Sequence, residues 1–261
     1  MTAPVTTHSS MLPVRLTAPP VNPAPQGLYT ATIWTEVSGP SRHLLGVEVR
    51  GINYGGGSAF GVWETDWCSV PPLDGERKEG TRPDWLDPFT PMTVWAYDEC
   101  DLTAPSRREV EQRAAQIMRL QEQVAVEREF ANRLLTDAGT PESVDNITEA
   151  ISHLEAEFAK TNTTGFIHLG AQWVTYAAES QLLTKAGTRL TTPLGHTLVF
   201  GGGYVEGLEN TLVATSQPFG WRDEVQVRTA IDEKRNTFAT VVERNVAVGY
   251  EAVIGAATVT P

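Results

Sequence analysis

The feature that most constrains the fold of this 261-residue chain is segment 106–135, which contains neither glycine nor proline. Its apolar residues recur at helical spacing, and one stripe holds Val110, Ala114, Ile117 and Val124, widened by Met118 and Leu120. Ser106 and Glu109 have the spacing of a capping box, which predicts the start of a helix, and Gly139 predicts its end. At 1.5 Å per residue the helix would be roughly 45 Å long. We therefore expect it to cross the molecule as a spine.

The second half of the chain alternates short helix and strand patterns. A helix is predicted to begin at Thr140 and Pro141, a cap followed by proline at the first position. Its apolar stripe comprises Val144, Ile147, Ile151, Leu154 and Phe158. A third helix is predicted at 171–183. Strand patterns occupy 166–169, 196–200, 210–218, 224–229, 237–253 and 254–260. This mixture indicates the α+β class.

The first 26 residues hold six prolines, one arginine and no acidic residue. Proline disfavours a helix, and the segment has little to bury, so we expect an extended arm resembling polyproline. Such an arm either moves freely in solvent or lies along a partner, and the sequence leaves both open. The candidate contact residues in it are Pro19, Pro20, Pro23 and Pro25.

The region between the arm and the long helix is rich in β-branched and aromatic residues. Its strand patterns are 27–37, 43–54, 59–70 and 89–101. In the last of these, Val94 and Ala96 face the side opposite to Trp95 and Tyr97.

Seven tryptophans are present, and five of them precede residue 100. Three lie beside a charged loop at 71–85, namely Trp63, Trp67 and Trp85. A core role and an interface role are equally compatible with this position.

Composition excludes several classes of function. The net charge is −12 and no basic block occurs, so nucleic-acid recognition is not expected of this chain. No apolar run reaches the roughly 18 residues that a membrane helix needs, and the N-terminus lacks the pattern of a signal peptide. Cys68 and Cys100 are too few and too far apart for a disulfide framework or a zinc site, and are expected to be reduced and half-buried.

The run of three glycines at 201–203 is the most suggestive catalytic candidate. A phosphate-binding loop requires a lysine and a hydroxyl after the glycines, or a helix aimed at a pyrophosphate. Here Tyr204 follows, and Glu206 and Glu209 would repel phosphate. The glycines therefore indicate a turn between strands, with positive φ or close backbone approach. His168 is expected to be a hydrogen-bonded core histidine. The sequence predicts neither a catalytic site nor a bound cofactor or metal.

Acidic and basic residues alternate along the predicted spine helix. The acidic set is Glu109, Glu111, Glu122, Glu127 and Glu129, and the basic set is Arg107, Arg113, Arg119, Arg128 and Arg133. This pattern is typical of a solvated or interface face crossed by ion pairs. We select Arg113, Glu122 and Arg128 as candidate subunit contacts.

The order of these elements resembles the major capsid protein of tailed bacteriophages, whose fold is named after phage Hong Kong 97 and is shared with encapsulin shells. The stretches that carry the resemblance to members from actinobacterial phages are 20–29, 124–135, 164–177, 182–204 and 231–253. The resemblance implies five segments: an N-arm at 1–28, an extended E-loop region at 29–88, a P-domain strand and spine helix at 89–137, an A-domain at 138–221, and P-domain strands at 222–261.

The resemblance also implies the partners. The chain would form hexamers and pentamers with itself in an icosahedral head shell, enclosing double-stranded DNA without reading its sequence. Portal, scaffold and decoration proteins would be further partners. The chain would be made in the host cytoplasm and would end in the virion capsid.

Two alternatives stay open at this stage. One is an encapsulin shell that holds a cargo enzyme, and the other is a monomeric ligand-binding domain that uses the glycine turn. Some capsid proteins join an E-loop lysine covalently to a neighbour's asparagine. Lys78 is the only lysine before the spine helix, but no partner residues match, so cross-linking is not favoured.

Overall fold

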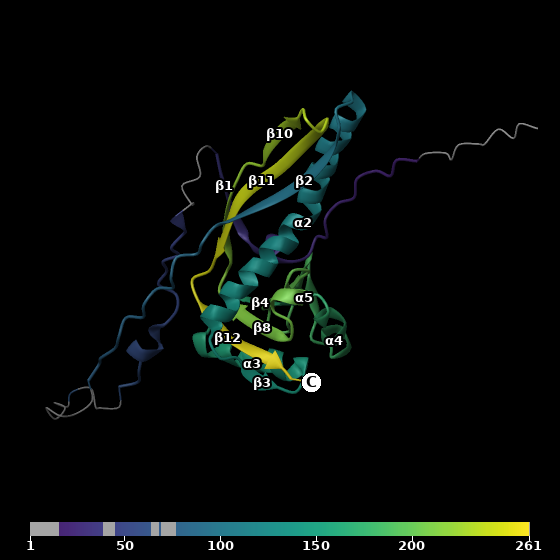
Figure 1. Cartoon of the computed structure of the whole chain (residues 1–261). Coiled ribbons are helices and arrows are strands. Elements are labelled where there is room, and N and C mark those ends of the chain that lie inside the picture. Colours follow the sequence, from purple (N-terminus) through teal and green to yellow (C-terminus); the bar gives the residue numbers. More distant parts are fainter. Residues whose placement is uncertain (1–15, 39–44, 64–67, 69–76, 261) are drawn as a thin grey trace, which may run out of the picture.

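The computed structural model describes residues 16–38, 45–63, 68 and 77–260. Figure 1 shows an elongated body in which one long helix, α2 (Ala104–Ala138), runs from the upper end to the lower end. One sheet lies beside the first half of α2, and a second sheet with the shorter helices lies beside its last half. Two extensions leave the body on opposite sides: the N-terminal segment and the long connection between β1 and β2.

The remaining helices are α1 (Leu28–Ala31), η2 (Gly56–Ala59, a 3-10 turn), α3 (Ile147–Thr161), α4 (Trp173–Glu179) and α5 (Tyr204–Gly207). The strands are β1 (Ile33–Val37), β2 (Met92–Asp101), β3 (Glu142–Val144), β4 (Phe166–Gly170), β5 (Thr184–Ala186), β6 (Arg189–Thr191), β7 (Thr197–Gly201), β8 (Thr211–Thr215), β9 (Phe219–Asp223), β10 (Gln226–Asp232), β11 (Thr237–Gly249) and β12 (Val253–Val259).

The first sheet is organised around β11. Its order is β1-β9-β11-β10, and β2 pairs with β11 along the other side in antiparallel register, from Met92 opposite Val246 to Asp101 opposite Thr237. As predicted, Val94 and Ala96 are buried, while Trp95 and Tyr97 are exposed on the opposite face. The buried face packs on α2 and forms one hydrophobic core.

The second sheet has the order β3-β12-β8-β4-β7-β6-β5. Every residue of β4 and β8 is buried, which matches their central positions. Helix α3 covers this sheet with Ile151, Leu154 and Phe158, so a second core forms. Strand β12 joins this sheet although β10 and β11 belong to the first one. The predicted P-domain segment 222–261 thus spans both sheets, and the domain boundaries stay a prediction.

Helix α2 begins earlier than the sequence suggested. Its N-cap is Thr103, no side chain caps its backbone, and Pro105 occupies its first turn. The predicted capping box of Ser106 and Glu109 is wrong, because the helix already starts at Ala104 and both residues lie inside it. Pro105 permits this earlier start, since the N–H groups of a first turn have no partner within the helix and proline has no N–H to lose. The predicted end at Gly139 is confirmed. The 35-residue helix is about 52 Å long.

The buried face of α2 winds around the helix. Its members are Val110, Ala114, Met118, Glu122, Val126, Glu127, Phe130, Ala131 and Leu134. Steps of four residues advance about 40° beyond one full turn, so this row drifts around the axis. One helix can therefore face the first sheet with its first half and the second sheet with its last half. The predicted stripe is wrong for Ile117, which is exposed.

Helix α3 starts at Ile147 and not at Thr140. The Asn146 side chain accepts from Glu149 N at 3.0 Å, and the Glu149 carboxylate accepts from Asp145 N at 3.1 Å. This reciprocal cap satisfies two free N–H groups and fixes the helix start. The residues after Pro141 form β3 instead.

The predicted strands at 43–54 and 59–70 do not appear in the described residues of those ranges. These residues hold a single bridge, Val47 to Phe89, and η2 lies between the two ranges with only Ala59 inside the second one. An extended segment becomes a strand only where a neighbour accepts its hydrogen bonds, and the described part of the chain offers the rest of this loop no neighbouring strand. Segment 27–37 divides into α1 and β1. Cys68 and Cys100 are free, but both are exposed, which corrects the expected half-burial.

The glycine run connects β7 to the short helix α5 and not directly to another strand. None of the three glycines has positive φ. The other expected cause, close approach of the turn to neighbouring backbone, therefore explains why glycine occupies these positions. A Cβ on Gly203 would lie 2.1 Å from Val124 O and 2.7 Å from Arg128 N, both backbone atoms of α2. Only glycine lets this turn rest on the long helix.

We therefore expect Gly203→Ala to lower stability by about 1–3 kcal/mol or more, because the added methyl must displace backbone. Gly202→Ala is the matched control, since its Cβ would meet only Val124 Cγ2 at 3.4 Å. Chemical denaturation of both variants measures the difference. Equal stability of the two would contradict the assigned contact.

Candidate assembly surfaces

The last part of the N-terminal segment lies along α2 and is held by polar side chains of that helix. Gln116 Nε2 donates to Val21 O at 2.8 Å, and Gln123 Nε2 donates to Gln26 O at 2.6 Å. Between them, Arg119 donates to the side chain of Asn22. These donors recur at i, i+3 and i+7, the spacing of one helix face. The arm therefore leaves the body along a path that its own chain sets.

Glu127 completes this set of contacts at the root of the arm. It is fully buried, and its Oε1 accepts from Leu28 N at 2.9 Å, while Oε2 accepts from Gly203 N at 2.9 Å. Gln123 also donates to Oε1 at 2.9 Å. One carboxylate thus joins the arm, α2 and the glycine turn.

Burial raises the pKa of Glu127, and the backbone donors from Leu28 and Gly203 oppose the rise. Because the pKa of Glu127 is higher in the folded chain than in the unfolded chain, the folded state binds a proton at Glu127 more readily. Ionised Glu127 therefore lowers the folding stability at neutral pH. This loss of stability disappears as the pH falls from the pKa of the folded state to the pKa of the unfolded state.

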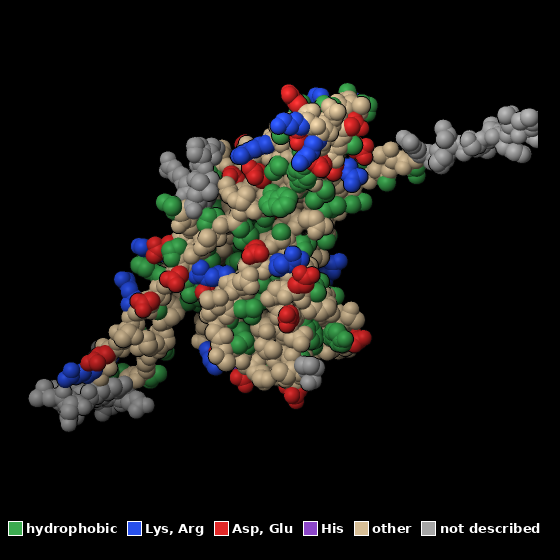
Figure 2. Space-filling model, viewed as in Figure 1, with side chains coloured by type: hydrophobic (Ala, Val, Ile, Leu, Met, Phe, Trp, Pro, Cys, Tyr) green, Lys and Arg blue, Asp and Glu red, His purple; other side chains and the backbone are tan. Residues whose placement is uncertain are grey.

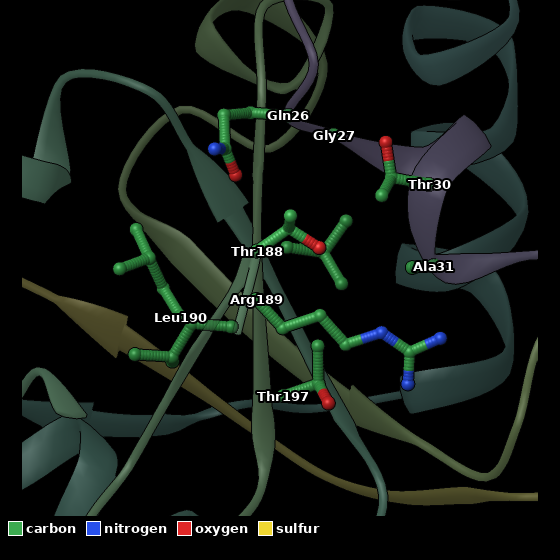
Figure 3. A pocket seen from close by; sticks show the side chains of 10 residues that line it. Gln26, Gly27, Thr30, Ala31, Thr188, Arg189, Leu190 and Thr197 are labelled. Carbon is green, nitrogen blue, oxygen red and sulfur yellow. The ribbon is translucent and has the colours of Figure 1, made fainter. Parts of the chain in front are cut away.

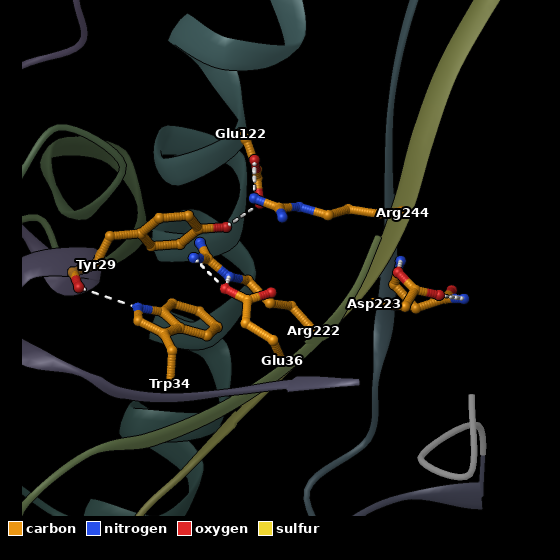
Figure 4. A network of polar contacts seen from close by, with 8 residues as sticks. Tyr29, Trp34, Glu36, Glu122, Arg222, Asp223 and Arg244 are labelled. Carbon is orange, nitrogen blue, oxygen red and sulfur yellow. Dashed lines mark hydrogen bonds and ion pairs between the residues drawn. The ribbon is translucent and has the colours of Figure 1, made fainter. Parts of the chain in front are cut away.

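Figure 4 shows a second polar group beside the arm root. The Glu122 carboxylate receives Arg244 Nε and Nη2, each at 2.7 Å, and Tyr29 OH at 2.6 Å. Burial and the Glu122 carboxylate raise the pKa of Tyr29, which keeps its proton. The expectation that Glu122 lies on a solvated face is corrected, since it is buried and bonded within the chain. Its role in a subunit contact is untested.

The same figure shows how β1 is attached to β9. Arg222 Nε donates to Glu36 Oε1 at 2.7 Å, and its guanidinium stacks 4.6 Å from the Trp34 ring centroid. Trp34 Nε1 donates to Tyr29 O at 3.0 Å. The segment after the arm is thereby fixed to the first sheet.

A small depression of about 20 Å³ lies between the arm root and the hairpin of β5 and β6, and Figure 3 shows side chains that line it. Gln26, Gly27 and Thr30 form one wall, and Arg189 and Leu190 form another. It brings together no pair of acidic, histidine or cysteine side chains that could support catalysis. We assign it no chemistry.

The long connection between β1 and β2 is fastened at its base. The Glu251 carboxylate accepts from Asn53 N and Nδ2, both at 2.7 Å. Arg133 donates to Pro88 O at 3.1 Å and to Asp87 O at 2.6 Å. Beyond these anchors the described residues of the loop extend away from the body (Figure 1).

The loop carries apolar side chains into solvent. Leu45 and Ile52 are almost fully exposed, and Phe60 is 84% exposed. On the body, Trp95 is 67% exposed and borders a groove of about 220 Å³ between β2 and α2, which Met92, Met118 and Ala125 also line. Figure 2 shows apolar surface both on the loop and on the upper half of the body. A groove lined by apolar side chains and an extended loop with several large apolar side chains in solvent are candidate interaction surfaces.

The other residues selected from sequence have these positions. The four arm prolines are exposed. Lys78 Nζ lies 4.8 Å from the Trp63 ring centroid, and Arg50 lies 4.4 Å from that of Trp85. Arg113 pairs with Asp98 at 3.2 Å, and Arg128 pairs with Glu206 at 2.9 Å. Trp67 lies outside the described residues. The structure tests none of these as subunit contacts.

His168 is the hydrogen-bonded core histidine that was expected. Its Nδ1 lies 3.0 Å from Tyr204 OH and its Nε2 lies 2.9 Å from Thr215 Oγ1. Burial lowers its pKa to about 3, so it stays neutral at physiological pH. Among the described residues, no cluster of three or more metal-ligating side chains occurs, and no helix is long and apolar enough to span a bilayer.

The body, its spine and its two extensions can be compared with known proteins. The sequence matches no protein-family profile and no curated protein. Among solved structures, the capsid of an empty GTA particle matches with TM-score 0.57 and 10% identity, covering 95% of this chain and 94% of that one. A virus-like particle from Pyrococcus furiosus matches with TM-score 0.51 and 10% identity, covering 90% and 92%.

The chain has the Hong Kong 97-type capsid fold. The α+β class and the fold expected from sequence are confirmed. The sequence missed Glu127 as an organiser of this fold, because the alternating charges of α2 gave no sign of which carboxylate is buried. The two residues to which it binds, Leu28 and Gly203, are 99 and 76 positions away.

We expect Glu127→Gln to loosen the arm root. Both carboxylate oxygens accept backbone N–H groups, and a glutamine nitrogen cannot accept, so one N–H loses its partner at a cost of about 1–3 kcal/mol. Hydrogen exchange should become about tenfold faster near Leu28 or Gly203. Glu129→Gln, an exposed site on the same helix, should leave exchange unchanged. Unchanged exchange at both amides of Glu127→Gln would sink the assignment.

Proposed function

We propose that this chain is a shell protein that assembles with copies of itself into a closed icosahedral capsid. The observation that carries the proposal is a Hong Kong 97-type body with two extensions, one of them fastened at its base and displaying Phe60 and Ile52 to solvent. A loop held firmly while its apolar side chains stay uncovered is suited to contact a neighbour.

The extensions then acquire roles. The N-arm (1–28) and the E-loop region (29–88) lie over neighbouring copies in the proposed shell. The spine helix with residues 89–137 and 222–261 forms the P-domain, and residues 138–221 form the A-domain around the hexamer and pentamer axes. The groove beside Trp95 offers a neighbour's loop an apolar surface. In this role the chain is structural and has no catalytic task.

We further propose that the shell is a phage head that encloses double-stranded DNA. The net charge of −12 suits a container that must not adhere to the packed genome. Portal, scaffold and decoration proteins are the further partners of this proposal, and the virion is its location. An encapsulin shell is the alternative within the same fold. Packaged DNA in particles from the native source supports the phage proposal, and a cargo enzyme supports the alternative.

The proposal predicts shells that depend on the exposed loop. Negative-stain imaging of the purified chain should show closed particles. Phe60→Asp should leave the monomer folded, because Phe60 is 84% exposed and belongs to neither core of the described residues, but should abolish or strongly reduce particles. Phe60→Leu, which keeps an apolar contact, should retain them. A chain that stays monomeric at all concentrations would favour the ligand-binding alternative and defeat the shell proposal.

The arm gives a second test. Removing residues 1–26 deletes the carbonyls to which Gln116 and Gln123 donate, and every described residue that it removes, 16–26, is exposed. We expect the truncated subunit to fold and its shells to melt at a lower temperature than full-length shells. Removing only residues 1–20 is the control, because it keeps the contacts of Val21 and Gln26 with α2. Comparing the two deletions distinguishes the contribution of residues 1–20 from that of the anchored residues 21–26. Shells of unchanged thermal stability after the longer deletion would refute a role of the arm.

A further inference from the structure

Strand β10 differs from the other strands of the first sheet. It forms one end of the sheet order, and all seven of its residues are exposed. Its register with β11 is continuous from Gln226 opposite Glu243 to Asp232 opposite Thr237. Within the described residues, no strand pairs with the backbone N–H and C=O groups of its outer edge, and no segment covers them.

This edge lacks most of the features that prevent edge-to-edge pairing. Natural edges are blocked by proline, bulges, short length, charged side chains or a covering segment, and of these β10 carries only the charges of Arg228 and Asp232. Strand β10 contains no proline, and its pairing with β11 has no bulge. Two β-branched residues on one face, Val227 and Ile231, are 57% and 49% exposed. An open, regular edge with exposed apolar side chains is a template for another strand.

We propose that β10 pairs antiparallel with β10 of a second copy across a two-fold axis at Thr229. In this register Val227 faces Ile231 of the other copy, and Thr229 faces its own counterpart. Pairs of β-branched residues and Thr–Thr pairs are favourable cross-strand neighbours. The pairing keeps every residue on its original face, because the side-chain period of a strand is two.

The charged residues on the opposite face of β10 also favour a second copy of β10 as the pairing strand. Gln226 faces Asp232 of the other copy, and Arg228 faces Ala230. Each Arg228 then lies diagonally beside one Asp232 of the other copy, within reach of its long side chain. The two Arg228 side chains also approach each other near the axis. Their repulsion is offset within each copy by Glu243, which lies 3.2 Å from Arg228. Antiparallel self-pairing thus matches both faces of β10.

This inference adds to the proposed function, because it names one contact between copies and the residues that make it. A two-fold axis between β10 strands is compatible with a closed shell, which contains two-fold axes. The pairing would also join two copies outside a shell. The two ideas can therefore fail separately.

Cysteine cross-linking tests the register. In a background of Cys68→Ser and Cys100→Ser, which removes both exposed native thiols, Thr229→Cys places each new thiol opposite its own counterpart. Directly opposed Cβ atoms in an antiparallel pair are about 4.5–5.5 Å apart, near the range of a disulfide. Under mild oxidation we expect most chains to migrate as covalent dimers on a non-reducing gel.

Lys234→Cys in the turn between β10 and β11 is the matched control. It is exposed in the same hairpin but would face residue 224 of the other copy, so it should give only background dimer. Val227→Cys and Ile231→Cys should cross-link when mixed before assembly and not when alone. Dimers from Lys234→Cys as abundant as those from Thr229→Cys would overturn the proposal, as would the absence of dimers in folded Thr229→Cys protein.

Imaging of the same samples separates the two ideas. Closed particles without Thr229→Cys dimers would support the shell and refute the β10 pairing. Dimers without particles would support the pairing and refute the shell. Circular dichroism confirms that each variant is folded before either outcome is scored.

Discussion

The interaction on which the rest of the structure depends is the burial of α2 against two different sheets. A straight helix can serve both because its buried row drifts around the axis, from Val110 near its start to Leu134 near its end. One core lies between α2 and both sheets, because it contains Val94 of the first sheet together with Phe166 and Val213 of the second. The other core lies between the second sheet and α3 and contains no residue of α2. The helix therefore joins the two sheets through a single shared core.

Two buried carboxylates on α2 connect this body to the extensions. Glu127 receives backbone donors from the arm root and from the glycine turn, and Glu122 receives Arg244 and Tyr29. A buried carboxylate is costly unless donors surround it. The cost of leaving either one unsatisfied therefore favours one position for the segment from Gly27 to Trp34. The arm therefore leaves the body in a defined direction.

The proposed assembly function rests on segments that are hydrogen-bonded to the body at one end or edge and exposed to solvent at the other. Arg133 and Glu251 bind backbone and side-chain groups at the base of the long loop, while Phe60 lies in solvent. Strand β10 shows the same contrast, since one edge pairs with β11 and no described strand pairs with the other edge. Hydrogen bonds fix the position of the long loop and of β10 on the body, and in the proposed shell other copies would bury their exposed side chains.

The sequence by itself determined the long helix, the strands β4, β7, β8, β11 and β12, the faces of Val94 and Trp95, and the core position of His168, because periodicity and composition are local properties. It did not predict the strands β3, β5, β6 and β9. It also pointed to the fold through the order of these elements. Only the tertiary structure decided that Glu122 and Glu127 are buried, that Asn146 starts α3, and that 43–54 forms no strand within the described residues. Those outcomes depend on partners distant in the sequence, which local patterns do not encode.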